Sequence, residues 1–194
     1  MMQELIRKVQ TLGVIILNNT KVEAYIEHLN KVSIQTPHFE FSSQKLIFTT
    51  NGFAKQLINE NVQPARAQVL ITKPIENLDI KGTFHLDCGY YYFRNIDNRI
   101  LLGGGRHLDI KTETTTKLAQ TEKIQQSLEN LLKYTILPER DYEIDHRWSG
   151  IMGVGSQKKP IVKQLSNHVY CGVRMGGMGV AIGSLIGKEV SDFF

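Results

Sequence analysis

The glycines near the carboxyl end of the chain are the residues whose spacing most directly indicates chemistry. In the run VYCGVRMGGMGVAIG, a predicted strand ends near Val173, the glycines at 176, 177 and 179 follow, and a predicted helix begins directly afterwards. Glycine lets the backbone approach a ligand closely, and the first turn of a helix offers unpaired N–H groups with partial positive charge. Such a turn suits a phosphate or another negatively charged group. Glycine-rich turns of this kind also occur for packing reasons, and the run alone leaves both interpretations open.

A second turn of the same type lies in the first third of the chain. The apolar run KLIFTT leads into Asn51-Gly52, and the segment FAKQLI then has the composition of a short helix. A buried strand that ends in small residues before a helix leaves free backbone N–H groups at the junction. The sequence therefore contains two candidate backbone sites, and both depend on small residues more than on side-chain chemistry.

The elements that position these turns follow from the hydrophobic spacing. Apolar residues between Leu5 and Leu12 recur at helical spacing, and Gly13 follows as a stop signal. From 68 to 110 the chain is typical of antiparallel sheet, with GYYYFR and RILLGGGR forming a hairpin around the turn NIDN. Helix-bracketed strands at both ends predict an α+β fold. Further strands are expected at 14–17, 22–27 and 32–36, and further helices at 112–134 and 180–194.

Composition narrows the function classes. The 194 residues include 41% hydrophobic and 22% charged residues, which is typical of a folded globular chain. The net charge of +4 is scattered, so we expect no nucleic-acid binding. Cys88 and Cys171 form no metal or redox spacing and are expected to be small buried thiols in a reducing compartment. No apolar stretch approaches the length of a membrane helix, and the prediction is a cytoplasmic protein without a metal.

Several short blocks, in this order and spacing, resemble the D-amino-acid-oxidase family of flavin enzymes, which includes glycine oxidase and sarcosine oxidase. The blocks are TTNGFA, ARAQVLIT, GYYYFR with RILLGGGR, RWSGIMG, and the terminal GGMGVAIG before a helix. The resemblance covers essentially the whole chain. It implies that residues 1–60 and 150–194 belong to a Rossmann-like FAD-binding domain, and that 61–149 form a mostly antiparallel substrate domain with one long helix. It also implies oxidation of the C–N bond of an amine or amino acid by hydride transfer to flavin.

The resemblance has one conspicuous gap. The family binds the FAD pyrophosphate at a G-x-G-x-x-G turn, and the glycine runs at 103–105 and 176–179 precede the wrong elements to supply it. The chain is therefore expected to be the carboxy-terminal half of the family's pattern, inactive and weak in FAD binding by itself. The alternative is a non-catalytic fragment or binding subunit that needs a partner chain, and an exposed apolar surface is expected to promote dimerisation or aggregation.

Residues for the cofactor carry over from the resemblance. Val22 is similar to the residue whose backbone meets the adenine end of FAD, although it is alternatively only a core strand residue. The turn Thr50-Asn51-Gly52 matches a turn lying against the cofactor. The closing loop matches the one over the polar edge of the flavin ring, and it comprises Gly176, Gly177, Met178, Gly179 and Val180. These are backbone roles that need small residues for access.

Residues for the substrate carry over less directly. Tyr91 stands where relatives place a tyrosine in the substrate pocket; alternatively, Tyr91 and its neighbouring tyrosines are cross-strand packing partners. Met152 stands where relatives often carry an arginine that clamps the substrate carboxylate. Either Arg174 or Arg106 then holds the carboxylate, or the substrate is an amine without one near the flavin, which we favour. Both arginines are alternatively solvated charges. The histidines at 85, 107 and 146 lack a partner at a recognisable spacing and are expected to be structural.

Overall fold

The computed structural model describes residues 2–194, which form two compact units. The smaller unit comprises the chain up to Leu46 together with Leu165–Val169. It contains one helix and a three-stranded antiparallel sheet in the order β1-β2-β3. The strand β3 was not predicted from the sequence. The elements are α1 (Met2–Thr11), β1 (Ala24–Glu27), β2 (Val32–Gln35) and β3 (Glu40–Ser43).

The first helix ends where the sequence predicted. Gly13 adopts φ +84°, a conformation in which glycine carries no steric penalty, and α1 stops two residues earlier. The strand predicted at 14–17 is wrong, because these residues have no strand partner among the described residues. Their side chains are exposed instead, and Ile15 is 84% accessible. An apolar run becomes a strand only when a neighbour satisfies its backbone groups.

The larger unit is built on a five-stranded antiparallel sheet in the order β6-β7-β8-β5-β9. The predicted hairpin is confirmed as β7 and β8, which pair Tyr91 with Gly104 and Ile96 with Arg99. Both residues of its tight turn, Asp97 and Asn98, have positive φ, as in the hairpin turns that match strand twist. The strands are β5 (Gln63–Thr72), β6 (Thr83–Leu86), β7 (Tyr91–Ile96), β8 (Arg99–Gly104) and β9 (Ile144–Val154).

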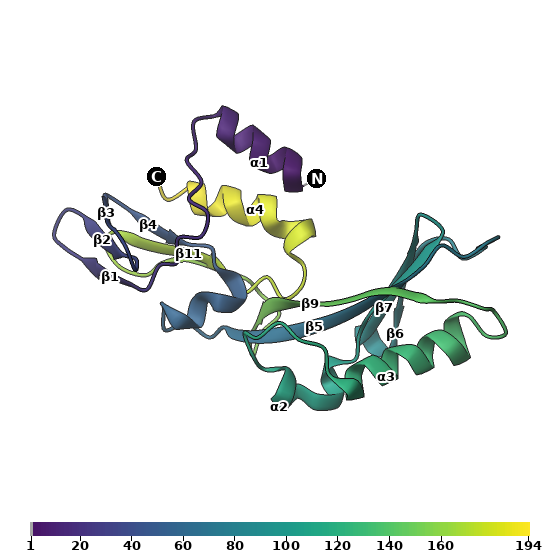
Figure 1. Cartoon of the computed structure of the whole chain (residues 1–194). Helices are drawn as coiled ribbons and strands as arrows, with labels where there is room; N and C mark the ends of the chain where they lie inside the picture. Colours follow the sequence, from purple (N-terminus) through teal and green to yellow (C-terminus); the bar gives the residue numbers. More distant parts are fainter. Residues whose placement is uncertain (1) are drawn as a thin grey trace. The chain divides into compact units, whose positions relative to one another are not determined.

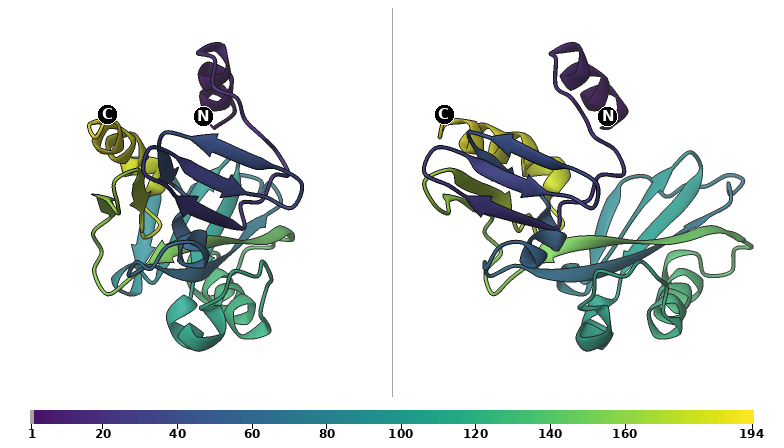
Figure 2. Two further views of the ribbon diagram at one scale, coloured as in Figure 1. Left: turned by 90° about the vertical axis from the view of Figure 1, so that its left-hand side faces the viewer. Right: turned by 60° about the vertical axis from the view of Figure 1, so that its left-hand side comes forward.

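Helices cover one face of this sheet (Figures 1 and 2). The core cluster joins Leu70, Phe93 and Leu102 of the sheet to Leu128 of α3. The helix predicted at 112–134 is shorter than expected, because residues 114–121 run as a non-helical strap across the sheet before α3 begins. The helical elements here are α2 (Ile110–Glu113), α3 (Glu122–Leu131) and a π-helical turn (Leu132–Ile136), with short 3₁₀ helices at Asp87–Gly89 and Arg106–Asp109.

A second, smaller sheet has the order β10-β11-β4, and β11 is buried throughout. Val190 and Ile186 of α4 lie within 3.2 Å of the position where a Cβ on Gly172 would stand, so α4 packs closely on β11. Antiparallel sheets with helices segregated on their faces confirm the α+β class. Among residues 2–194, no helix has the length and apolar character that crossing a membrane requires. The elements are β4 (Leu46–Phe48), η1 (Asn51–Gln56), β10 (Ile161–Gln164), β11 (Val169–Val173) and α4 (Gly179–Ser191).

Candidate functional site

The two glycine-containing turns lie side by side in the larger unit. The backbone N–H of Met175 donates a hydrogen bond to Oδ1 of Asn51 over 3.0 Å. The N–H of Gly176 donates to the carbonyl of Gly153, at the end of β9, over 2.9 Å. Asn51 therefore holds the closing turn through its side chain. The sequence pattern predicted only a backbone role for this residue.

Close backbone approach explains why glycines stand at this junction. A Cβ atom on Gly52 would lie 2.7 Å from the carbonyl oxygen of Met152, and one on Gly153 would lie 2.6 Å from Oδ1 of Asn51. The first contact is with a backbone oxygen, so a side chain at position 52 requires the backbone to move. The turn after β4 and the end of β9 are thus packed backbone against backbone.

The closing turn presents free donors to solvent. Gly176 and Gly177 have φ of +56° and +86°, and no atom lies within 4 Å of a Cβ placed on Gly176. Within the described chain, the N–H groups of Gly177, Gly179 and Val180 have no hydrogen-bond acceptor. The last two begin the 13-residue helix α4, whose N-terminus carries partial positive charge. This arrangement can stabilise negative charge on a group lying against the turn.

One prediction concerns the link between the two turns. Replacing Asn51 with alanine removes the acceptor for Met175, and we expect hydrogen exchange of the Met175 amide to accelerate by about tenfold. Asn51→Asp keeps an acceptor oxygen and is expected to restore most of the protection. Amide exchange measured by NMR on the two variants tests this. Equal exchange in wild type and Asn51→Ala would contradict the role of the side chain.

The turn borders the uncovered face of the five-stranded sheet. Leu70, Phe93 and Leu102 point into the core between the sheet and α3, so the residues next to them along each strand point to the opposite face. We call this the open face. The register aligns four of its residues in one row across β9, β5, β8 and β7, namely Trp148, Val69, Gly103 and Tyr92. Trp148 is 40% exposed there.

Met152 connects the open face to the closing turn. Its sulfur lies 3.1 Å from the position of a Cβ on Gly177, and the register pairs it with Ala65. A thioether offers soft apolar contact and no charge. Position 152, at the end of the open face nearest the closing turn, therefore provides no guanidinium. Sequence reasoning missed Trp148 and Gly150 on the same face, although their two-residue spacing with Met152 was a usable signal.

The other predicted site residues are placed as follows. Tyr91 lies on the helix side of β7, where its hydroxyl is 2.7 Å from Oγ of Ser127. Arg174 is buried, and its Nε and Nη1 donate to the carbonyls of Lys159 and Asn61 over 2.8 and 3.0 Å. Thr50 is exposed and precedes η1. Val22 is half-buried in the smaller unit, two residues before β1. Their roles toward substrate or cofactor stay predictions.

Two further candidates adjoin the hairpin. The buried Nε of Arg106 and the buried Nδ1 of His107 have no hydrogen-bond partner among the described residues. The ring of His107 lies 4.1 Å from that of Tyr90 and 5.4 Å from that of Tyr91, centroid to centroid, and its Nε2 is 3.5 Å from Asp87. The histidine thus packs among aromatic rings, in keeping with the structural role expected for it.

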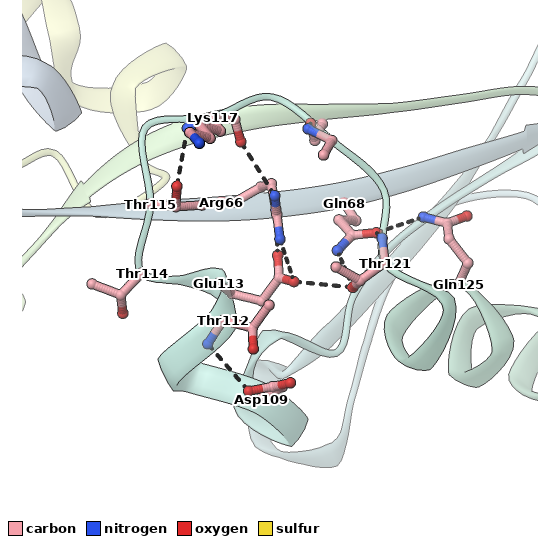
Figure 3. Close-up of polar contacts among 12 residues, drawn as sticks. Arg66, Gln68, Asp109, Thr112, Glu113, Thr114, Thr115, Lys117, Thr121 and Gln125 are labelled. Carbon is pink, nitrogen blue, oxygen red and sulfur yellow. Dashed lines mark hydrogen bonds and ion pairs between the residues drawn. The ribbon is translucent and has the colours of Figure 1, made fainter.

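A buried network of hydrogen bonds joins β5 to α2 and to the strap at 114–121 on the helix side of the sheet (Figure 3). The guanidinium of Arg66 donates to both carboxylate oxygens of Glu113 over 2.8 and 2.9 Å, and Nη1 reaches the carbonyl of Lys117. Gln68 and Thr121 continue the network along the strap. Burial raises the pKa of Glu113, but hydrogen bonds from its neighbours and the charge of Arg66 outweigh it, so the pKa lies below its ordinary value.

Comparison with known proteins identifies the family of the chain. The sequence profile of the family described as "FAD dependent oxidoreductase" (DAO) matches residues 1–193. The probable oxidoreductase OrdL of Haemophilus influenzae is 22% identical over 93% of this chain and 43% of its own length. The gamma-glutamylputrescine oxidoreductase of Escherichia coli is 21% identical over 86% and 40%.

Solved structures share the fold. Glycine oxidase from Bacillus cereus superposes with a TM-score of 0.79 at 16% identity, and L-proline dehydrogenase from P. horikoshii with 0.75 at 17%. Each match covers 96% of this chain and 52% of the other. The chain spans about half the length of the relatives it matches. It belongs to the DAO family of FAD-dependent oxidoreductases.

Proposed function

We propose that the chain is the carboxy-terminal portion of an FAD-dependent enzyme that oxidises the C–N bond of an amine or amino acid. The observation that carries the proposal is the contact between the Asn51 turn and the closing glycine turn beside the open face. Relatives named glycine oxidase, L-proline dehydrogenase and gamma-glutamylputrescine oxidoreductase act on amines or amino acids, which supports this substrate class.

The residues present fit the flavin end of FAD. Gly176 leaves open space where a side chain would stand, and the unpaired N–H groups of Gly177, Gly179 and Val180 suit a ring edge that gains negative charge. When bound, FAD supplies the acceptor for the hydride that leaves the carbon next to the amine nitrogen. The chain's own residues orient the substrate on the open face and stabilise charge at the turn.

The pyrophosphate of FAD needs a different cradle. The 194 residues contain no G-x-G-x-x-G turn between a strand and a helix, so tight FAD binding is proposed to require another segment that provides it. We expect the purified chain alone to hold far less than one FAD per molecule. A yellow protein with near-stoichiometric flavin absorbance would overturn this expectation.

The experiment supplies a pyrophosphate-binding segment from a relative. We expect co-expression with the amino-terminal half of a relative, such as glycine oxidase from Bacillus cereus, to give a complex that retains FAD. Amine substrates are expected to bleach the flavin absorbance of this complex. Gly177→Val crowds the turn against Met152 and is expected to reduce FAD content at least tenfold. The matched control is Gly187→Ala in α4, where no atom lies within 4 Å of the added Cβ.

A second candidate function is a non-catalytic subunit that completes its fold with a partner. It is favoured by α1, which has no buried residue, and by the exposed apolar run at 14–17. Apolar surface of this extent commonly marks an interaction site. The same co-expression separates the two proposals, because a non-catalytic subunit forms the complex without gaining flavin or amine-dependent bleaching.

A further inference from the structure

The open face carries an unpaired cation far from the closing turn. Arg94 of β7 lies on this face because its neighbour Phe93 points into the core. Among residues 2–194, no acceptor pairs with the guanidinium of Arg94.

The other charged groups at this end of the open face already have partners. Arg99 forms an ion pair with Asp145, and Nδ1 of His146 lies 3.3 Å from the same carboxylate. His85 stands opposite Tyr92 on β6. The face is therefore open to an anion at Arg94.

The surface between Arg94 and the closing turn is apolar, and it is unobstructed at Gly150. Val69, Ile71 and Leu101 point to this face between Trp148 on β9 and Tyr92 on β7. Tyr92 lies over Gly103, where a Cβ would stand 2.5 Å from the phenol oxygen, so a larger residue at 103 would displace the Tyr92 ring. By contrast, no atom lies within 4 Å of a Cβ on Gly150. The surface above Gly150 can accept part of a ligand.

Tyr92 adds a neutral donor to this surface. Burial raises the pKa of its phenol, so the hydroxyl keeps its proton at neutral pH. Arg94 is two residues along the same strand and on the same face, at about 7 Å. A ligand group that reaches Arg94 therefore passes Tyr92.

The two ends of the open face differ in what they offer a ligand. Met152 contacts the closing turn and provides no charge. The row that contains Arg94 also contains His146, which is six residues from Met152 along β9, or about 20 Å at the rise of a strand. A carboxylate on the reacting carbon beside the closing turn is too far away to reach Arg94. An anionic group at the far end of an extended molecule can reach Arg94.

We infer that the open face binds an elongated amine whose apolar chain lies between Trp148 and Tyr92 and whose distal anionic group pairs with Arg94. This inference rests on the proposed function for the identity of the amine end. It names the substrate class as an amine that carries a carboxylate or similar anion at the other end of an apolar chain. Arg94 then determines specificity, and the missing arginine at Met152 is explained, because the anion is held elsewhere.

Trp148 provides a direct assay, because it is the only tryptophan in the chain and lies on the open face. The 194-residue chain is titrated with 12-aminododecanoate, which is long enough to approach Arg94 from the closing turn, and separately with dodecylamine, while Trp148 fluorescence is recorded. A charge-assisted hydrogen bond to Arg94 is expected to make the amino acid bind about tenfold more tightly than the amine. The assay needs no flavin, so its outcome is independent of whether the co-expressed complex retains FAD.

Variants assign the effect to Arg94. Arg94→Gln is expected to abolish the preference for 12-aminododecanoate over dodecylamine, and Arg94→Lys to keep part of it. The matched control is Arg140→Gln, which removes an arginine paired with Asp79 outside the open face and is expected to leave the preference unchanged. The inference is overturned if the two probes bind equally to wild type, if neither changes the fluorescence up to about 10 mM, or if Arg94→Gln retains the preference.

Discussion

Replacing Glu113 with alanine is expected to lower the free energy of unfolding by about 3–5 kcal/mol, because it leaves the guanidinium of Arg66 buried without its counter-ion. Arg66 and Glu113 are 5% and 1% exposed, so water cannot replace the lost carboxylate. The pair also anchors the strap, since Arg66 binds the carbonyl of Lys117 and Thr121 donates to Glu113 (Figure 3). Urea unfolding followed by circular dichroism measures the change.

A matched ion pair on the surface provides the control. Lys73 and Glu143 are 2.6 Å apart, but both side chains are more than half exposed. Glu143→Ala is therefore expected to cost about 1 kcal/mol or less. The double variant Arg66→Met/Glu113→Leu removes both buried charges and is expected to recover much of the stability lost in Glu113→Ala. Similar losses for Glu113→Ala and Glu143→Ala would show that burial does not set the strength of the Arg66 pair.

The same pair predicts how stability depends on pH. The pKa of Glu113 is lower in the folded chain than its ordinary value of 4.5, so the unfolded chain binds the proton more readily. The stabilisation by Glu113 is fully present above that ordinary value and is lost as the pH falls through the lower folded pKa. We expect the acid-induced decrease in stability to be smaller in Arg66→Met/Glu113→Leu than in wild type, as unfolding titrations between pH 6 and about pH 3 would show.

Replacing Gly52 with alanine is expected to cost about 2–3 kcal/mol, because the new Cβ would lie 2.7 Å from the carbonyl oxygen of Met152 and 2.8 Å from Cγ2 of Ile151. The first of these atoms belongs to the backbone of β9 and cannot rotate away. The turn that carries Asn51 must then move from β9, and the hydrogen bond from Met175 is expected to weaken with it. Thermal unfolding and amide exchange at Met175 report the two effects.

Gly150→Ala provides the steric contrast for this experiment. Gly150 is on the same strand as Met152, but nothing lies within 4 Å of its added Cβ, and its φ is not positive. We expect stability to change by less than about 1 kcal/mol, in the stabilising direction, because alanine restricts the unfolded chain more than glycine does. An equal loss in both variants would mean that the glycine at 52 is not required by its contact with β9.

Much of the local structure was predictable from the sequence because it depends on residues close together in the chain. The hairpin of β7 and β8 follows from two branched and aromatic runs around Asp97 and Asn98, whose positive φ suits a tight turn. The helix α1 follows from its apolar spacing and the stop at Gly13. The Asn51 and Gly176 turns were both assigned to the cofactor only through the family resemblance, and the structure places them side by side.

Tertiary contacts decided the rest. The strap at 114–121 is not helical, because Gln68 and Arg66 bind its backbone from a strand about fifty residues earlier, and Leu118 is left 68% exposed. No periodicity within the strap reveals such partners. The run at 14–17 has the composition of a strand, but composition cannot provide a neighbouring strand to pair with.

The division between sequence and tertiary structure is clearest at the candidate site. The types and order of the glycines, and the methionine at 152, are properties of the sequence, and together with the family resemblance they led to the prediction that backbone groups recognise a flavin cofactor. Packing against α3 decided which face of the sheet Tyr91 and Tyr92 occupy. Carbonyl groups distant in the sequence decided what Arg174 contacts. Side-chain direction in a sheet alternates regularly, but only the position of the core determines which face is left for a ligand.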